Sequence, residues 1–179
     1  MCIRDSLDYV RALAEEFGYA VAPTATREQA GERVSSTRIR AALADADFDI
    51  AERLLGRPFE MAGRVQHGQK LGRQLDAPTA NIALHRIRSP LHGVYAVNVS
   101  GGGLAGAPGV ANVGVKPTIG ESLKATLEVH VLEGSPDLYG ERLTVRFRHK
   151  LRDEKKFPSL EALKEGIATD KAKARAWLA

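Results

Sequence analysis

The sequence predicts a mainly β protein, a small antiparallel barrel of six strands followed by a C-terminal helix. From Phe59 onward, apolar residues recur at every second position, which is the period of a strand with one buried face. Clusters of Gly, Pro and Asp divide this region into short segments at the spacing of a small barrel. After Ser159 the apolar residues change to helical spacing.

Six segments are expected to form the strands of the barrel. In the last of them Leu143, Val145 and Phe147 should face the core, and the basic residues between them should form a solvated outer face. The expected strands are Phe59–Gln66, Thr79–Leu84, Val94–Ser100, Pro108–Val113, Ala125–Leu132 and Arg142–Arg148.

The C-terminal helix is expected to begin at Ser159 and to carry Glu161 in its first turn, where a carboxylate is favourable. One apolar stripe runs along it. The stripe consists of Leu160, Leu163, Ile167, Ala174 and Leu178.

The first 56 residues differ from the rest in their pattern. Apolar residues at helical spacing predict a helix that ends at Gly18, and Tyr19–Ala22 is expected to form a short strand. A lone helix and strand bury too little surface to form a domain. We therefore expect residues 1–56 to be the C-terminal remnant of a larger α/β domain and residues 57–179 to be the barrel domain.

Two more helices are expected before the barrel. The first begins near Ser35 and Ser36, and the second covers roughly Phe48 to Leu55 before Gly56 and Pro58 end it. The serines have two interpretations. They either cap the helix, or the helix N-terminus and Arg38 hold a phosphate.

Composition limits the functional classes. The chain has 179 residues with 44% hydrophobic and 27% charged residues, which is ordinary for a soluble globule. Its apolar runs are too short to span a membrane, and Cys2 alone cannot form an internal disulfide, so we expect a cytoplasmic protein. The net charge of +4 suits an anionic ligand such as a nucleotide or a nucleic acid, or has no functional meaning.

The segment His67–Asn81 has the composition of a nucleotide-binding loop. Gly68 and Gly72 would let the backbone approach a polyphosphate closely. The segment ends in Pro-Thr-Ala-Asn, and the oxygens of Thr79 and Asn81 are of the kind that Mg²⁺ accepts. The alternative is a polar loop that leads into a strand.

A candidate base lies in the expected strand around Glu128. Leu127 and Val129 should share the buried face, while Glu128 and His130 share the other face. Phosphoryl transfer to an alcohol needs a base near the hydroxyl, together with groups that hold the phosphates. The alternative is a glutamate that simply faces solvent.

One dinucleotide-like motif does not support a cofactor site. The segment 101–106 fits GxGxxG, but Pro108 and a strand follow it instead of the helix that would receive a pyrophosphate. We therefore expect a hairpin loop there. The five histidines also fall in no spacing typical of zinc ligands.

Several ordered motifs resemble those of riboflavin kinases. Residues 64–81, which include Gly68, Gly72, Arg73 and the Pro-Thr-Ala-Asn sequence, are similar to the nucleotide-binding segment of that family. Further similar segments follow in the same order over roughly residues 57–178, and this order is far more specific than any one motif. They are Gly93–Ala96, Ala111–Gly114 with Lys116–Thr118, Leu127–His130, Asp137–Gly140 and Leu151–Phe157.

The resemblance implies a six-stranded Greek-key barrel that phosphorylates riboflavin with ATP to give FMN and ADP. It implies that Thr79 and Asn81 hold Mg²⁺ and the nucleotide phosphates, that Pro78 belongs to the same nucleotide-binding motif, and that Glu128 acts as general base. It also implies roles for two loops. The first loop, which closes over ATP, contains Gly68, Lys70, Gly72 and Arg73, and the second, which closes the flavin site, runs from Arg152 to Phe157.

The sequence departs from the family in one place. Leu75-Asp76-Ala77 stands where the family usually has Leu-Gly-Phe. An acidic side chain beside bound phosphates would repel them unless it points outward.

Residues upstream of the barrel resemble the end of the adenylyltransferase half of bacterial bifunctional riboflavin kinase/FAD synthetase. The similar segments are Ser35–Arg40 and Leu54–Pro58, and the His-x-Gly-His-type opening of that half is absent. The resemblance therefore implies a complete kinase module behind a truncated synthetase module, with no membrane or nucleic-acid partner. Two alternatives stay open, a basic barrel that binds nucleic acid and a chain that still makes FAD. The sequence does not indicate an oligomeric state.

Overall fold

The computed structural model describes residues 3–23, 25–29, 31–67, 78–84, 89–117, 123–134 and 136–179. The chain separates into two compact units, one ending at Val34 and the other comprising Ser35–Ala179. The first unit contains helix α1 (Ile3–Phe17) and a small hairpin of β1 (Glu28–Gln29) and β2 (Glu32–Arg33). The expected strand at Tyr19–Ala22 is wrong, because these residues are neither helix nor strand.

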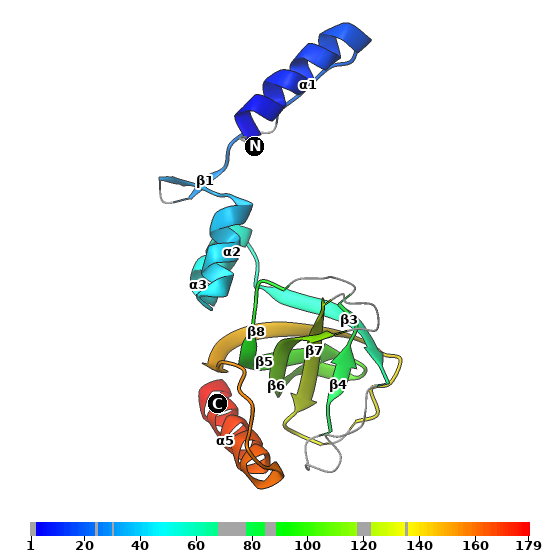
Figure 1. The fold of residues 1–179 in the computed structure, drawn as a ribbon, viewed down its shortest axis with the longest axis vertical. Coiled ribbons are helices and arrows are strands. Elements are labelled where there is room, and N and C mark those ends of the chain that lie inside the picture. Colours follow the sequence, from blue (N-terminus) through cyan, green and yellow to red (C-terminus); the bar gives the residue numbers. More distant parts are fainter. Residues whose placement is uncertain are drawn as a thin grey trace. The chain divides into compact units, whose positions relative to one another are not determined.

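The second unit is built on a closed antiparallel barrel of six strands, as predicted (Figure 1). Neighbouring strands in the barrel follow the order β3-β4-β7-β6-β5-β8, and β8 closes it onto β3. The strands are β3 (Glu60–Gln66), β4 (Ala80–Ile82), β5 (Gly93–Gly101), β6 (Leu104–Pro117), β7 (Leu123–Val131) and β8 (Arg142–Arg152).

The predicted alternation places the barrel core correctly. Leu143, Val145 and Phe147 on β8 are buried, as are Leu127 and Val129 on β7. The glycine-rich segment after β5 forms the hairpin to β6, with Gly101 opposite Leu104, so no dinucleotide-type helix follows it. The barrel therefore has an apolar interior, and polar side chains at the alternate positions are left on its outer surface.

Two short helices precede the barrel and cover part of it. They are α2 (Ser36–Ala44) and α3 (Phe48–Leu55), whose bounds agree closely with the prediction. The Ser35 side chain accepts a hydrogen bond from the Arg38 backbone N–H, so the capping interpretation of this serine holds. Phe48 packs against Tyr95 and Phe147 with ring centroids 5.9 and 6.2 Å apart. Both helices thus share the core of the barrel, although they fall within the segment 1–56 that we assign to another domain.

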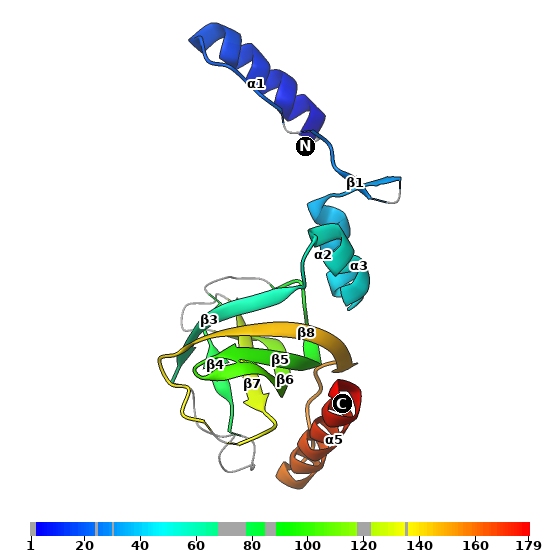
Figure 2. The same ribbon diagram turned by 180° about the vertical axis from the view of Figure 1, so that it is seen from behind.

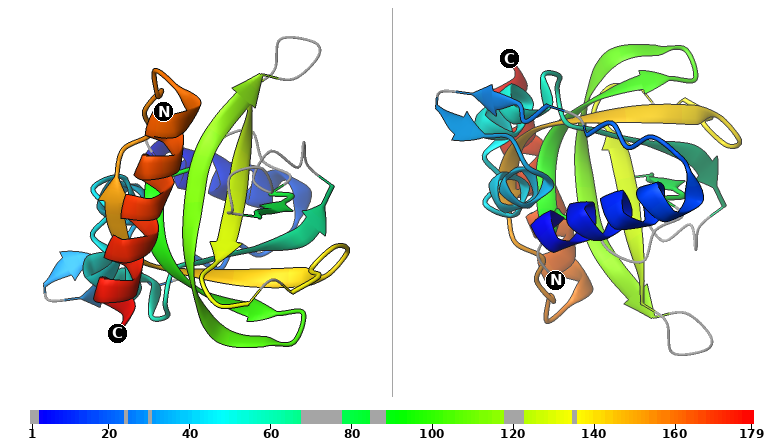
Figure 3. Two further views of the ribbon diagram at one scale, coloured as in Figure 1. Left: turned by 90° about the horizontal axis from the view of Figure 1, so that it is seen from below. Right: turned by 90° about the horizontal axis from the view of Figure 1, so that it is seen from above.

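Helix α5 (Leu160–Leu178) begins after the predicted cap, Ser159, and lies along the outside of the barrel (Figures 2 and 3). It contacts β5, β6 and β8. Ala174 is completely buried, whereas Leu160 at the other end of the predicted stripe is exposed, so only part of that stripe packs on the strands. In the described part of the chain, no helix is both long enough and apolar enough to cross a membrane.

Candidate active site

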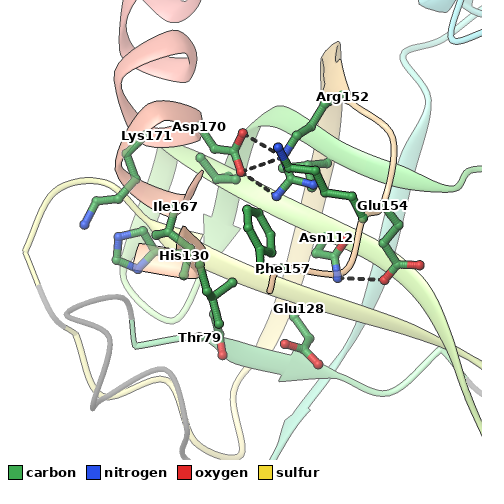
Figure 4. Close-up of a pocket in the computed structure, with 14 residues that line it drawn as sticks. Thr79, Asn112, Glu128, His130, Arg152, Glu154, Phe157, Ile167, Asp170 and Lys171 are labelled. Carbon is green, nitrogen blue, oxygen red and sulfur yellow. Dashed lines mark hydrogen bonds and ion pairs between the residues drawn. The ribbon is translucent and has the colours of Figure 1, made fainter. Parts of the chain in front are cut away.

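A cavity of about 300 Å³ lies between the outer surface of the barrel and α5 (Figure 4). Its floor is formed by residues of β5, β6 and β7 and by Thr79, which precedes β4. Its walls are formed by α5, the end of β8 and the segment between β8 and α5. The residues that line it are Thr79, Val94, Val110, Asn112, Glu128, His130, Arg152, Glu154, Lys155, Phe157, Leu163, Ile167, Asp170 and Lys171.

The predicted base and the predicted metal-binding corner meet on this surface. In the pairing of β4 with β7, Asn81 lies directly opposite Glu128. Side chains in such a pair have Cβ atoms about 4.5–5.5 Å apart and share one face of the sheet. Thr79, two residues before Asn81, lines the same cavity as Glu128. The structure therefore places Thr79 and Glu128 in one cavity and Asn81 beside Glu128 on the neighbouring strand, although Asn81 is not among the residues that line the cavity.

Asn112 extends this polar row onto a third strand. It is paired with Glu128 across β6 and β7, so Asn81, Glu128 and Asn112 lie side by side on three neighbouring strands. The Asn112 amide nitrogen donates a hydrogen bond to a Glu154 carboxylate oxygen at 3.2 Å. Its amide oxygen is buried and accepts no hydrogen bond from any described residue. Because buried acceptors are normally hydrogen-bonded, this oxygen is suited to accept a hydrogen bond from a hydroxyl or N–H group of a ligand.

Glu154 reaches Asn112 because residue 114 is a glycine. Gly114 lies two residues beyond Asn112 on the same face of β6, and the Glu154 carboxylate occupies the space that a Cβ atom would take there. The segment after β8 can therefore lie flat against β6. This contact joins two parts of the chain that are about 40 residues apart, and no local sequence pattern indicates it.

The opposite wall is held by an ion pair between Arg152 at the end of β8 and Asp170 on α5. Three hydrogen bonds of 2.8–3.0 Å join the two side chains, and Asp170 is only 4% exposed. The Arg152 guanidinium also lies 5.4 Å from the centroid of the Phe157 ring. The predicted ligand-binding residue Arg152 thus lines the cavity, and its guanidinium is bonded to Asp170 (Figure 4).

His130 occupies the end of the cavity near Lys171 (Figure 4). Its Nδ1 atom lies 2.9 Å from the backbone oxygen of Pro78. Burial is the main cause that lowers the pKa of His130 below 6.5; the Pro78 contact acts in the opposite direction, and the nearby cations Lys171 and Arg175 lower the pKa further. The neutral form of the ring therefore predominates at pH 7.

The predicted loop residues Gly68, Lys70, Gly72 and Arg73 lie outside the residues that the structure describes, as does the Asp76-Ala77 departure. Asn112, Glu154, Asp170 and Lys171 are cavity residues to which the sequence argument assigned no individual role. The importance of Asp170 could have been recognised from the sequence. It lies three residues after Ile167 and four before Ala174, on the apolar side of the helix, where a carboxylate needs a cationic partner.

A closed six-stranded barrel carries on its outside a cavity that is lined by both apolar side chains and a few polar ones, among them Glu128 and Asn112, which is the character of a small-molecule binding site. Comparison with known sequences identifies the family. The family model for riboflavin kinase, or flavokinase, matches residues 55–178, and the chain belongs to this family.

The relatives found are bifunctional enzymes. The chain is 57% identical over 169 residues to the bifunctional riboflavin kinase/FMN adenylyltransferase of Pseudomonas fluorescens, covering 94% of this chain and 54% of that protein. Identity to the protein of the same description from Escherichia coli is 48% over 160 residues, covering 89% and 51% respectively. The chain spans about half the length of these relatives and matches their C-terminal half, which contains the kinase.

A solved structure shares the fold. It is a crystal structure described as a macrolide-efflux protein from Streptococcus pneumoniae, with a TM-score of 0.73 and 32% sequence identity. The match covers 93% of this chain and 55% of that one. This likeness extends over almost the whole of the present chain, including segments upstream of the barrel.

Proposed function

We propose that the barrel transfers the γ-phosphoryl group of ATP to the terminal ribityl hydroxyl of riboflavin, giving FMN and ADP, with Glu128 as general base. The observation that carries this assignment is the position of Glu128 directly opposite Asn81, in the cavity that Thr79 also lines. The hydroxyl oxygen attacks the γ-phosphorus while the bond to the β–γ bridging oxygen breaks. The hydroxyl proton passes to the Glu128 carboxylate.

Magnesium and the nucleotide phosphates belong, in this proposal, at the Thr79 and Asn81 end of the polar row. Thr79 precedes β4 by one residue and lines the cavity, whereas Asn81 lies on β4 opposite Glu128; a hydroxyl and an amide oxygen are both hard donors that suit Mg²⁺. Magnesium supplies charge neutralisation on the phosphate oxygens when it is bound. We extend the nucleotide site to Pro78 and to the loop residues Gly68, Lys70, Gly72 and Arg73, on the resemblance alone.

Riboflavin, in the same proposal, occupies the part of the cavity nearer α5. That part is lined by apolar side chains, among them Val110, Leu163 and Ile167, and by the Phe157 ring, which suit a flat aromatic ligand. Asn112 is paired with Glu128 across β6 and β7, and its amide oxygen accepts no hydrogen bond from any described residue. A ribityl chain could therefore extend over Asn112 toward Glu128, with its hydroxyls as the missing donors.

The direct test is an incubation of the chain with riboflavin, ATP and Mg²⁺, with the products resolved by chromatography. We expect equal amounts of FMN and ADP. Absence of FMN from a folded sample would reject the proposal. Pyrophosphate release from ATP and FMN, measured in a parallel reaction, separates this activity from FAD synthesis and tests whether the chain retains any adenylyltransferase function.

A further inference from the structure

The His130 side chain continues the contact between β4 and β7 beyond the point where their backbone pairing ends. The paired residues are Ile82 with Leu127, Asn81 with Glu128, and Ala80 with Val129. Pro78 and Thr79 precede the last of these pairs. His130 follows Val129, and its Nδ1 atom lies 2.9 Å from the Pro78 carbonyl oxygen. The imidazole therefore supplies the next link between the two strands.

This link specifies the tautomer of His130. A carbonyl oxygen only accepts hydrogen bonds, so the proton must be on Nδ1. Because burial lowers the pKa of the ring, the neutral form prevails at pH 7 and Nε2 carries no proton. The hydrogen bond to Pro78 thus selects one of the two neutral forms of the ring.

The link also fixes the backbone just before Thr79. The proline ring locks φ of Pro78, so ψ is its only soft backbone dihedral. The carbonyl of Pro78 and the N–H of Thr79 belong to one planar peptide unit. A bond that holds the carbonyl oxygen therefore fixes ψ of Pro78 and the plane from which Thr79 continues. The direction of the Thr79 side chain depends on that plane.

We propose that His130 is a positioning residue for nucleotide binding: its Nδ1–H holds the Pro78 carbonyl and so directs the Thr79 hydroxyl into the cavity. The proposal rests on the proposed role of Thr79 and adds a residue from a different strand to it. Its effect falls on the magnesium-nucleotide end of the cavity. The KM for magnesium-ATP should therefore depend on His130 more than the KM for riboflavin does.

Three substitutions of His130 distinguish the effect of its hydrogen bond from the effect of its ring shape. In His130→Asn the amide nitrogen can occupy the position of Nδ1, whereas in His130→Gln it reaches the position of Nε2. His130→Phe keeps a planar ring and removes both nitrogens. We expect Asn to retain a KM for magnesium-ATP near that of the wild type. The Gln and Phe variants should raise it by about five- to tenfold, the usual worth of one hydrogen bond. Because His130 lies opposite Val110, in the part of the cavity assigned to riboflavin, the KM for riboflavin should also change, but by a smaller factor than the KM for magnesium-ATP.

The control is His149→Asn, because His149 stacks on Trp177 with centroids 5.2 Å apart and does not line the cavity. It should leave both KM values unchanged. Equal values of the KM for magnesium-ATP in the three His130 variants would overturn the proposal. So would a variant that changes the KM for riboflavin by the same factor as the KM for magnesium-ATP.

Two further measurements keep the test independent of folding and of the role of Thr79. The ¹⁵N chemical shifts of His130 in the wild-type protein report the tautomer, and a proton on Nε2 alone would overturn the proposal.

In a Thr79→Ala background, His130→Gln should cause no additional rise in the KM for magnesium-ATP. If Thr79→Ala itself leaves that KM unchanged in an active enzyme, the role of Thr79 fails. A rise caused by His130→Gln in the Thr79→Ala background would instead show that His130 does not act through Thr79.

Discussion

Two arginines of β8, Arg152 and Arg146, form ion pairs whose burial differs sharply, and this difference gives a quantitative prediction for Asp170→Asn. Asp170 and Arg152 have side chains 6% and 21% exposed and are 2.8 Å apart at their closest atoms. Glu52 and Arg146 are 45% and 36% exposed and 3.3 Å apart. Removing one partner of a buried pair leaves the other charge uncompensated, which typically costs about 3–5 kcal/mol, whereas an exposed pair contributes about 0–1 kcal/mol.

Because Arg152 is partly exposed and keeps its hydrogen bond to the Asp153 carbonyl, we place Asp170→Asn at the lower end, about 3 kcal/mol. For a unit of this size the loss corresponds to a fall in Tm of roughly 6–12 °C. Urea unfolding followed by circular dichroism measures the free energy directly. The matched control is Glu52→Gln, which should cost less than about 1 kcal/mol.

A double variant tests the cause of the loss. Adding Arg152→Met to Asp170→Asn removes the uncompensated cation, so part of the lost stability should return. If Asp170→Asn destabilises the protein no more than Glu52→Gln does, the Arg152–Asp170 pair does not hold α5 on the barrel, and our account of this cavity wall is wrong.

Three other outcomes are expected. Burial raises the pKa of Tyr95 to about 12 from 10.0, so the folded state keeps a proton that the unfolded state loses; urea midpoints should fall between pH 10 and about 12 in the wild type and fall less in Tyr95→Phe. Gly114→Ala should displace the Glu154 carboxylate from Asn112, raising the KM for riboflavin in steady-state assays while changing stability by about 1 kcal/mol or less; an unchanged KM would remove Glu154 from the cavity wall. Chelation of magnesium should abolish FMN formation and added Mg²⁺ should restore it, whereas full turnover in excess chelator would contradict a metal role.

The features that depend on local alternation could be predicted from the sequence. The period of two places Leu127 and Val129 inside the barrel and Glu128 outside it, and this one fact brings Glu128 to the cavity. The cap at Ser35 is equally local, because it needs only a side-chain oxygen three residues before a backbone N–H of the first helical turn. The family resemblance then supplied the closed Greek-key barrel and the chemistry, which alternation alone cannot give.

The features that depend on distant partners could not be predicted in this way. Tyr19–Ala22 has the composition of a strand but forms none, since a strand needs a neighbour to pair with. The hairpin between Glu28 and Arg33 has no apolar alternation, and its turn contains Gly31 at a φ of +75°. The contact of Glu154 with Asn112 needs the path of the chain after β8 as well as the absence of a side chain at Gly114.

The central claim is that Glu128 takes the proton of the attacking hydroxyl. Its most direct test is the single-turnover rate of FMN formation by Glu128→Gln, measured with saturating riboflavin and magnesium-ATP. Glutamine keeps the size and polarity of the side chain but cannot accept the proton, so we expect the rate to fall by about 10²–10⁴-fold. A variant that binds both substrates and turns over at the wild-type rate would contradict the account.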